Sequence, residues 1–268
     1  MGKHKFSILG LLFFLAFPTS LFCQSSSSIT TGKLFEEMID LEGLTRFPSP
    51  SYSMVQYSSY DHRSNLPGGP DWFANADGFG GEPIPNFEKV LKEPNEVGIG
   101  EYLMVNEEGP GAIVRLWTAQ INGNLRVYID DMMTPFYEGE ADSFFRHPYD
   151  NFNEIEVINR ERFNKTIYQR DASYAPIPFE KRIRIEWIGD LQKLHFYQIQ
   201  LRLYSQDAKI ISFQPEDINK YKTIIDKVTL ALADPDKNLP VKSSKKSQNF
   251  NVSIPAVTAN GLPERVPA

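Results

Sequence analysis

Short apolar runs alternate with polar turns along most of the chain, and this pattern predicts a fold rich in β-strands. The alternation is strictest in residues 182–188 (RIRIEWI) and 196–204 (FYQIQLRLY). A period of two places successive side chains on opposite faces of a strand, so one face is expected to be buried. The residues expected on the buried face are Ile183, Ile185, Trp187, Tyr197, Ile199, Leu201 and Leu203. Those expected on the wetter face are Arg184, Glu186, Gln198, Gln200 and Arg202.

Further strands are predicted upstream, where apolar runs are separated by turn residues. They cover residues 54–60, 101–106, 111–120 and 125–130. Turns are predicted at Glu107-Glu108-Gly109-Pro110 and at Asn122-Gly123-Asn124, because Gly, Pro and Asn favour tight turns. Many short strands that follow one another without intervening helices favour an antiparallel sandwich over an α/β sheet.

Two stretches carry apolar residues at helical spacing instead. Residues 30–45 predict a short N-terminal amphipathic helix, capped by Thr30 or Thr31 and ended by the prolines that follow. Residues 215–233 predict one longer helix near the C-terminus, with Pro215 in its first turn and Pro235 as its stop. Its apolar stripe consists of Ile218, Tyr221, Ile224, Ile225, Val228 and Leu232. Residues 142–173 are charged and aromatic, and we expect them to form an excursion from the sandwich.

The first 24 residues predict export. Lys3 and Lys5 precede an apolar run over residues 6–17, and a short basic start before such a run is typical of a secretory signal peptide. Residues 25–29 are then a spacer, and the mature protein belongs in a bacterial periplasm, on the cell surface or outside the cell. An alternative is a lipoprotein acylated on Cys23, but Phe22 is bulkier than that processing usually accepts. Cys23 is the only cysteine, so no disulfide can form within the chain.

Composition narrows the chemistry further. Of the 268 residues, 41% are hydrophobic, which suffices for a sizeable core. The net charge of −6 does not indicate a nucleic-acid partner. The histidines His62, His147 and His195 are not paired at metal-ligand spacing, and no nucleotide-binding glycine pattern lies in a suitable context. We therefore expect no metal and no cofactor.

Residues 58–78 (SSYDHRSNLPGGPDWFANADG) form the loop with the most promising chemistry. Its Pro and Gly residues favour turns, and its carboxylates, amides, guanidinium and indole suit a sugar site. One alternative is that the polar residues only shape turns, while Trp72 and Phe73 anchor the loop to a core. Another is a calcium site formed by Asp61, Asp71 and Asp77, although their spacing matches no known calcium loop.

Taken in order, five motifs resemble one known family. They are the loop just described, EGPGAIVRLWTA from Glu108, LRVYIDD from Leu125, APIPFEKRIRI from Ala175, and FYQIQLRLY. The chain resembles the proteins grouped as domain of unknown function 2961, also called glycoside hydrolase family 172, from about residue 34 to residue 234. The resemblance implies a jelly-roll protein that forms symmetric homo-oligomers and cleaves α-D-fructofuranosides or α-D-arabinofuranosides. It also implies a retaining mechanism with two glutamates roughly 5 Å apart.

The resemblance assigns the loop to substrate binding. The loop residues that match the family pattern are Asp61, Arg63, Asp71, Trp72, Asn75 and Asp77. Full-length relatives have two successive jelly rolls with the glutamate pair in the second, so the catalytic residues are expected beyond Ala268. Residues 30–235 are then the first jelly roll, and residues 236–268 are a linker and the start of the second. We assign no catalytic role to Glu82, Glu88 or Glu186.

The combined expectation is an all-β antiparallel jelly-roll sandwich with a short N-terminal helix and one longer helix near the C-terminus. Its expected function is the N-terminal part of an exported, furanoside-active glycoside hydrolase that lacks the catalytic pair. The partner is a furanoside glycan, and the full-length protein is expected to be a homo-oligomer. The open alternatives are a non-catalytic carbohydrate-binding module and a structural or interaction module.

Overall fold

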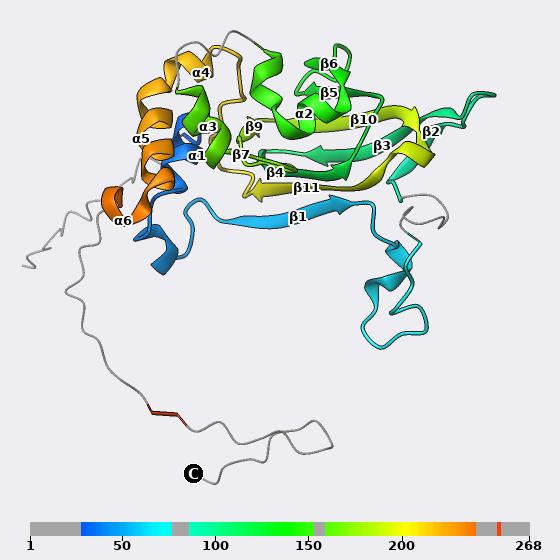
Figure 1. Ribbon diagram of the computed structural model, residues 1–268, viewed down its shortest axis with the longest axis horizontal. Coiled ribbons are helices and arrows are strands. Elements are labelled where there is room, and N and C mark those ends of the chain that lie inside the picture. The colour runs from blue at the N-terminus through cyan, green and yellow to red at the C-terminus, as the bar shows by residue number, and fades with distance from the viewer. Residues whose placement is uncertain (1–27, 77–85, 153–158, 240–250, 253–268) are drawn as a thin grey trace, which may run out of the picture.

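The computed structural model describes residues 28–76, 86–152, 159–239 and 251–252, and these form a sandwich of two antiparallel sheets with helices packed around it (Figure 1). The strands are β1 (Tyr52–Ser58), β2 (Lys89–Lys92), β3 (Ile99–Glu108), β4 (Gly111–Gln120), β5 (Asn124–Ile129), β6 (Tyr137–Glu140), β7 (Tyr168–Gln169), β8 (Ala172–Ser173), β9 (Ile177–Phe179), β10 (Arg182–Asp190) and β11 (His195–Tyr204). The α-helices are α1 (Thr31–Glu37), α2 (Ala141–Arg146), α3 (Arg160–Thr166), α4 (Asp217–Lys220), α5 (Lys222–Ala233) and α6 (Pro235–Asn238). Four short 3-10 helices are η1 (Gly43–Thr45), η2 (His62–Asn65), η3 (Pro148–Asn151) and η4 (Leu191–Lys193).

The predicted strands are confirmed, and the structure adds which sheet each one joins. One sheet has the order β1-β11-β4-β8-β7, with β9 also paired to β4, and the other has the order β2-β3-β10-β5-β6. The predicted turn at Glu107–Pro110 leads from β3 to β4, and the turn at Asn122–Asn124 leads from β4 to β5. Both turns therefore join one sheet to the other, so neither closes a hairpin within a sheet.

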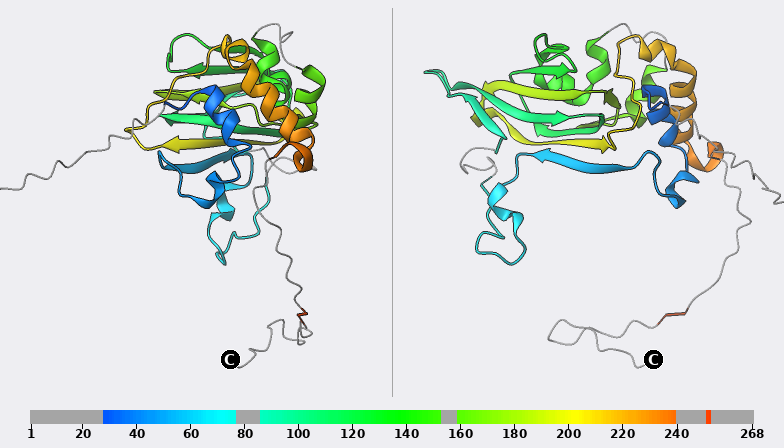
Figure 2. Two further views of the ribbon diagram at one scale, coloured as in Figure 1. Left: turned by 90° about the vertical axis from the view of Figure 1, so that its left-hand side faces the viewer. Right: turned by 180° about the vertical axis from the view of Figure 1, so that it is seen from behind.

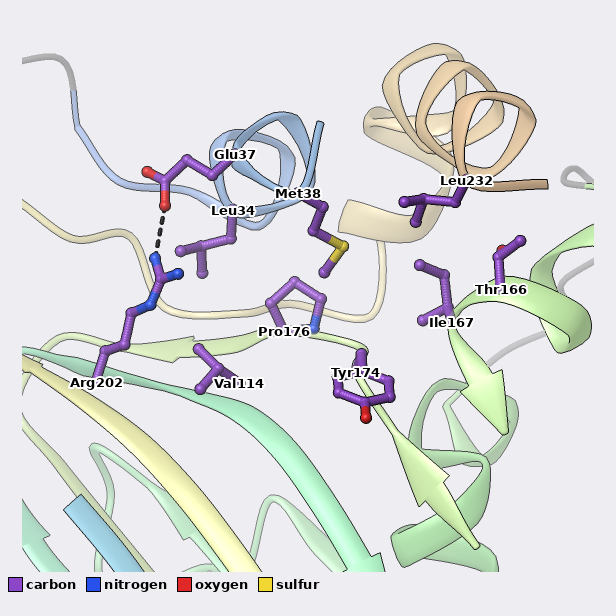
Figure 3. Close-up of a pocket in the computed structure, with 10 residues that line it drawn as sticks. All are labelled: Leu34, Glu37, Met38, Val114, Thr166, Ile167, Tyr174, Pro176, Arg202 and Leu232. Atoms are coloured by element: carbon purple, nitrogen blue, oxygen red, sulfur yellow. Dashed lines mark hydrogen bonds and ion pairs between the residues drawn. The ribbon is translucent and has the colours of Figure 1, made fainter. Parts of the chain in front are cut away.

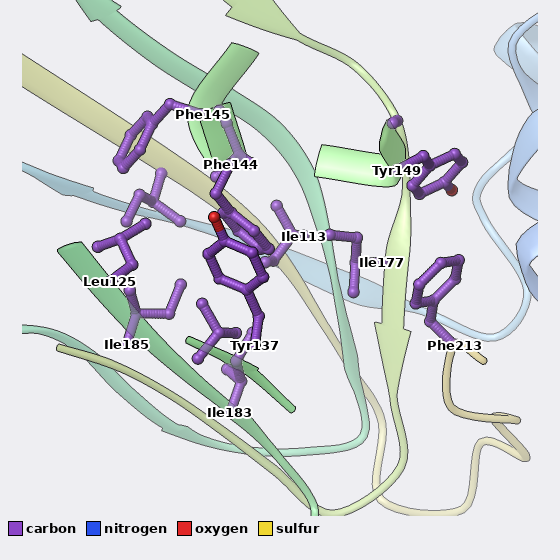
Figure 4. Packing of buried hydrophobic residues seen from close by; sticks show 14 of the residues in the cluster. Ile113, Leu125, Tyr137, Phe144, Phe145, Tyr149, Ile177, Ile183, Ile185 and Phe213 are labelled. Carbon is purple, nitrogen blue, oxygen red and sulfur yellow. The ribbon is translucent and has the colours of Figure 1, made fainter. Parts of the chain in front are cut away.

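The period-two pattern puts the expected side chains inside. Ile183, Ile185 and Trp187 of β10 are fully buried, and they face buried residues of β11 such as Ile199 and Leu201 across the core. Figure 4 shows Ile183 and Ile185 gathered with side chains from β4, β5 and α2.

In β4 the strict alternation fails, for a local reason. The pairing register shifts so that Gln200 lies opposite Arg115 while Leu201 lies opposite Ile113, which leaves Val114 as an extra residue. A bulge of this kind changes the face of the residues beyond it. Ile113 and Leu116 are consequently both buried, although they are three positions apart.

Glu186 lies on the predicted face of β10, opposite Arg126 of β5, but it is not exposed there. It was expected on a wetter face, but only 6% of its surface is exposed. Its carboxylate pairs with Arg184 and lies 3.8 Å from Arg126, which also binds Glu101 at 3.2 Å. A buried carboxylate needs oppositely charged partners to offset the loss of hydration. The two guanidinium groups beside Glu186 supply these partners.

The expected antiparallel sandwich is present, but the fold is mixed and not purely all-β, because 27% of the described residues are helical. The predicted excursion over residues 142–173 contains most of α2, then η3 and α3, and the strands β7 and β8, which belong to the six-stranded sheet. Its residues 153–158 lie outside the described residues. It is part of the core, since the following aromatic and aliphatic side chains are buried: Phe144, Phe145, Tyr149, Phe163, Ile167 and Tyr168.

Both predicted helices exist, but the N-terminal helix is shorter than expected and the C-terminal helix is divided. The N-terminal helix begins after Thr30, whose hydroxyl accepts a hydrogen bond from Lys33 N at 3.1 Å, and it ends at Glu37. The C-terminal helix breaks at Tyr221 into α4 and α5, and Pro235 begins the further helix α6. Helices α1, α3 and α5 pack together at one end of the sandwich (Figures 1 and 2).

The ends of the chain are described only in part. The predicted signal peptide, residues 240–250 and residues 253–268 lie outside the described residues. Ile29, the last residue of the predicted spacer, is buried and forms a parallel bridge with Ile210. Within the described ranges, none of the helices combines the length and apolar character that a membrane span requires.

Candidate functional site

The loop that follows β1 leaves the sandwich and projects away from both sheets (Figure 1). It begins with η2 and continues through turns up to residue 76, beyond which residues 77–85 lie outside the described residues. Its base is fastened to β11, because Tyr197 N donates to Ser59 Oγ at 3.2 Å and the Tyr197 hydroxyl donates to Asn86 O at 2.9 Å. Asn86 Nδ2 also donates to Ala76 O at 2.9 Å. The two ends of the loop are therefore held together at the sheet.

Asp61 is the main internal tie of this loop. Its carboxylate is buried and accepts hydrogen bonds from Arg63 N at 3.1 Å and from Ala76 N at 2.9 Å. It also accepts from Arg63 Nε at 3.0 Å and from Arg63 Nη2 at 2.6 Å. These donors, with the Arg63 side chain foremost, hold the pKa of Asp61 well below its ordinary value. The Asp61 carboxylate thus joins the start of the loop to residue 76. We call this set of hydrogen bonds, from Arg63 and Ala76 N to the Asp61 carboxylate, the Asp61 clasp.

Arg63 is held by this clasp while remaining open to solvent. Its side chain is 61% exposed, and the Asp61 carboxylate binds two of its nitrogens side by side. This bidentate contact raises the pKa of Arg63, and the charge of Asp71 acts in the same direction. The guanidinium is consequently fixed in orientation at the surface, which suits it to bind an exposed ligand.

The aromatic residues of the loop point outward. Trp72 is 40% exposed and Phe73 is 91% exposed. Phe73 therefore does not anchor the loop to a core, contrary to the alternative considered from the sequence. Asp71 and Asn75 are also exposed, whereas Asp77 lies outside the described residues.

The structure thus brings together only part of the predicted set. Asp61, Arg63 and Asp71 interact directly or through their charges, and Trp72 and Asn75 lie exposed on the same loop. Sequence reasoning missed Ser59, Ala76 and Asn86, which hold the loop through backbone atoms and short polar side chains. Such contacts leave no distinctive pattern in a sequence.

The described residues contain no group of three or more His, Cys, Asp or Glu side chains placed to hold a metal ion. Both oxygens of Asp61 already accept N–H donors, so this carboxylate is a poor starting point for the calcium alternative. The buried carboxylate of Glu186 is likewise engaged by Arg184 and Arg126. Glu82 lies outside the described residues.

Two hollows lie at the opposite end of β1 and include no residue of the loop. One is a cavity of about 330 Å³ beneath α1, and its lining is mostly apolar (Figure 3). The other, of about 310 Å³, is lined by charged and aromatic side chains together with Ile29, Leu44 and prolines. Glu37 and Arg202 line both, and their carboxylate and guanidinium meet at 2.6 Å.

Comparison with known proteins gives one positive result. Residues 50–221 match the model of the GH172 first beta-sandwich domain. These residues include all eleven strands and the loop after β1, but neither α1 nor α5. A search among curated proteins found no match to the chain.

Proposed function

Because the chain belongs to glycoside hydrolase family 172, we propose that it is the sugar-recognising first domain of an exported enzyme that cleaves furanosides. The observation that carries this proposal is the loop of residues 61–76. It projects from a β-sandwich of a glycosidase family, and it presents the fixed Arg63 guanidinium, the exposed Asp71 carboxylate and the exposed Trp72 indole.

Each residue predicted to bind sugar has a role in this proposal. The indole of Trp72 stacks against the C–H face of a sugar ring, and Arg63 donates hydrogen bonds to ring hydroxyls. The carboxylates of Asp71 and Asp77 accept further hydrogen bonds, and the Asn75 amide can both accept and donate. Asp61 is the exception, because its carboxylate is already bound within the loop and acts by orienting Arg63.

Catalysis belongs to a second part of the enzyme in this proposal. The chain matches the first sandwich domain of its family, and we propose jelly-roll connectivity for it. A retaining glutamate pair, with carboxyl groups roughly 5 Å apart, would be contributed by a second jelly roll in a homo-oligomeric enzyme. The proposed substrates are α-D-fructofuranosides and α-D-arabinofuranosides.

The binding role is tested by titrating the chain with arabinofuranosyl and fructofuranosyl oligosaccharides in a calorimeter. Trp72→Ala is expected to weaken binding at least tenfold, since burial of a large apolar side chain against a ligand contributes about 1.5–3 kcal/mol. Phe73→Ala is the matched control, because it removes a neighbouring exposed aromatic ring from the same loop and should change affinity by no more than about twofold. Equal losses of sugar affinity in both variants would show that the loop binds through nonspecific aromatic contact, and would contradict the proposed role of Trp72.

The catalytic assignment is tested separately, with aryl α-D-arabinofuranoside and aryl α-D-fructofuranoside. The complete gene product is expected to hydrolyse one of them, whereas residues 25–268 alone are expected to bind sugar without turnover. Binding by both proteins and hydrolysis by neither would favour a non-catalytic carbohydrate-binding module. Hydrolysis by residues 25–268 alone would contradict the proposal that catalysis belongs to a second jelly roll.

A further inference from the structure

The polar hollow at the start of β1 is built on the outer face of the six-stranded sheet. Tyr52 of β1 lies directly opposite Tyr204 of β11 in the strand pairing, so both side chains share one face. Arg202 is two positions before Tyr204 and lies on the same face, whereas Leu201 points into the core. The Tyr52 and Tyr204 rings meet edge to face at 5.5 Å, and the Arg202 guanidinium lies 4.6 Å from the Tyr52 ring centroid.

The segment before β1 encloses this face and forms the remaining wall. Ile29 and Leu34 pack on Tyr204, and Glu37 of α1 binds Arg202. Residues 43–50 then complete the hollow, which has a volume of about 310 Å³. Phe47 lines it although the residue is fully exposed, so this wall is thin and the hollow can be reached from solvent.

One buried hydroxyl group of the hollow has no hydrogen-bond acceptor among the described residues. Tyr204 is 6% exposed, and its hydroxyl makes no hydrogen bond of good geometry among the described residues. The Arg202 guanidinium, whose Nη1 binds Glu37, lies close enough to donate to the Tyr204 oxygen, but a guanidinium cannot accept the hydroxyl hydrogen. Buried polar atoms are normally satisfied, so an unpartnered hydroxyl that lines a hollow indicates a missing polar partner.

The charges of the lining select the class of that partner. Lys33, Arg46 and Arg202 are cationic, while Glu37 and Asp40 are anionic. The two carboxylates would repel an anion, and the three cationic side chains would repel a cation. A neutral polar molecule therefore fits best. Aromatic walls beside charged donors and acceptors suit a polyhydroxylated ring.

We propose that this hollow is a second carbohydrate-binding site, in which Tyr204 and the Glu37–Arg202 pair bind hydroxyl groups of a neutral sugar and Tyr52 and Phe47 contact its ring. The choice of a sugar rests on the proposed function, whereas the hollow itself does not. Most of its lining comes from residues 29–49, which precede the residues that match the family model. The site is therefore separate from the loop after β1, about 20 Å away along that seven-residue strand.

The test is calorimetric titration of the whole chain with oligosaccharides of arabinofuranose, fructofuranose and glucopyranose, with amide NMR signals followed in parallel. Tyr204→Phe removes only the hydroxyl and is expected to weaken one binding event about fivefold to tenfold. Phe47→Ala is a second variant with no folding cost, because the ring is fully exposed, and it should weaken the same event. Ligand-induced shifts are expected at residues 52 and 202–204.

Tyr102→Phe is the matched control, since the Tyr102 hydroxyl is also buried and without a partner but does not line this hollow. It should leave both binding events unchanged. Loss of binding in Tyr204→Phe but not in Trp72→Ala would support the second site and contradict the loop site. Loss in Trp72→Ala alone would overturn the second site and leave the proposed function standing. Absence of binding to all three sugars would overturn both.

Discussion

At the scale of single residues, the environment of a side chain decides its role more than its identity does. Asp61 and Asp71 lie ten positions apart in the same loop, yet one is buried and bound by four donors while the other is exposed. The difference follows from position, because Asp61 begins η2 where free N–H groups are available to cap. One carboxylate therefore organises the loop, and the other remains available to a ligand.

The clasp of Asp61 predicts a local dependence on pH. Because its pKa is lowered on folding, its contribution to loop stability is complete at neutral pH and starts to fall as the pH drops toward about 4, the ordinary aspartate value. It disappears only when the pH falls below the folded-state pKa. The amide signals of Arg63 and Ala76 should therefore persist through pH 4 and shift only in stronger acid.

Asp61→Asn provides the comparison for this titration. The variant cannot titrate, and it replaces a charged acceptor with a weaker neutral one, so the amides of residues 61–76 should exchange with solvent faster at every pH. If the Arg63 and Ala76 signals of the unaltered protein shift with a midpoint near pH 4, the clasp does not hold the carboxylate as the structure indicates.

At the scale of elements, the helices are joined by close contacts that local preference does not reveal. Thr31 of α1 donates a buried hydrogen bond of 2.6 Å to Asp217 of α4. The next residue, Gly32, lies against the ring of Tyr221, between α4 and α5. Helix α1 approaches its neighbours this closely because Gly32 has no side chain.

Gly32→Ala should therefore be destabilising, contrary to helix propensity. In an exposed helix this change stabilises by roughly 0.5–1 kcal/mol. Here a Cβ would lie 2.4 Å from Tyr221 Cδ1, and relieving such overlap costs about 1–3 kcal/mol. Urea unfolding measures the sign of the change directly.

A second substitution identifies the cause of this effect. In a Tyr221→Ala background the overlap is gone, so Gly32→Ala should become neutral or stabilising. A stabilising effect of Gly32→Ala in the otherwise unaltered protein would show that α1 lies farther from Tyr221 than the structure has it.

At the scale of the whole molecule, the sandwich is completed by helices that lie outside the family match. Phe35 of α1 and Ile225 and Val228 of α5 are fully buried and belong to the main core cluster. They cover Tyr149 and Phe163, with ring centroids of Phe35 about 6.3 Å from both. Segments on either side of the matched residues thus close one end of the sandwich.

A shortened chain of residues 50–221 should consequently be unstable. Each of the three lost side chains contributes about 1.5–3 kcal/mol, and the sum is comparable with the whole stability of an ordinary domain. We expect this chain to aggregate and to bind hydrophobic dyes, as judged by gel filtration and fluorescence. Residues 28–239 keep both helices and serve as the control, which should be monodisperse. A cooperative, monodisperse chain of residues 50–221 would contradict the proposed role of the helices.

The sequence by itself determined the six longest strands, most of the turns and the family. In β10 and β11, burial of one face repeats every second residue, and that period can be read without any knowledge of the partners. The polar loop was also identified, because its Pro and Gly residues exclude regular structure. These features depend on neighbours within a few positions.

Only the tertiary structure decided which sheet each strand joins, that Glu186 is buried and that residues 142–173 enter the core. It also decided that Asp61 binds Arg63 and Ala76, and that residues 29–50 enclose a hollow over Tyr204. These features arise from side chains that are distant in sequence, such as Thr31 and Asp217, and no local period records such pairs. A bulge that displaces a single residue, as in β4, is enough to change which face of a strand is buried.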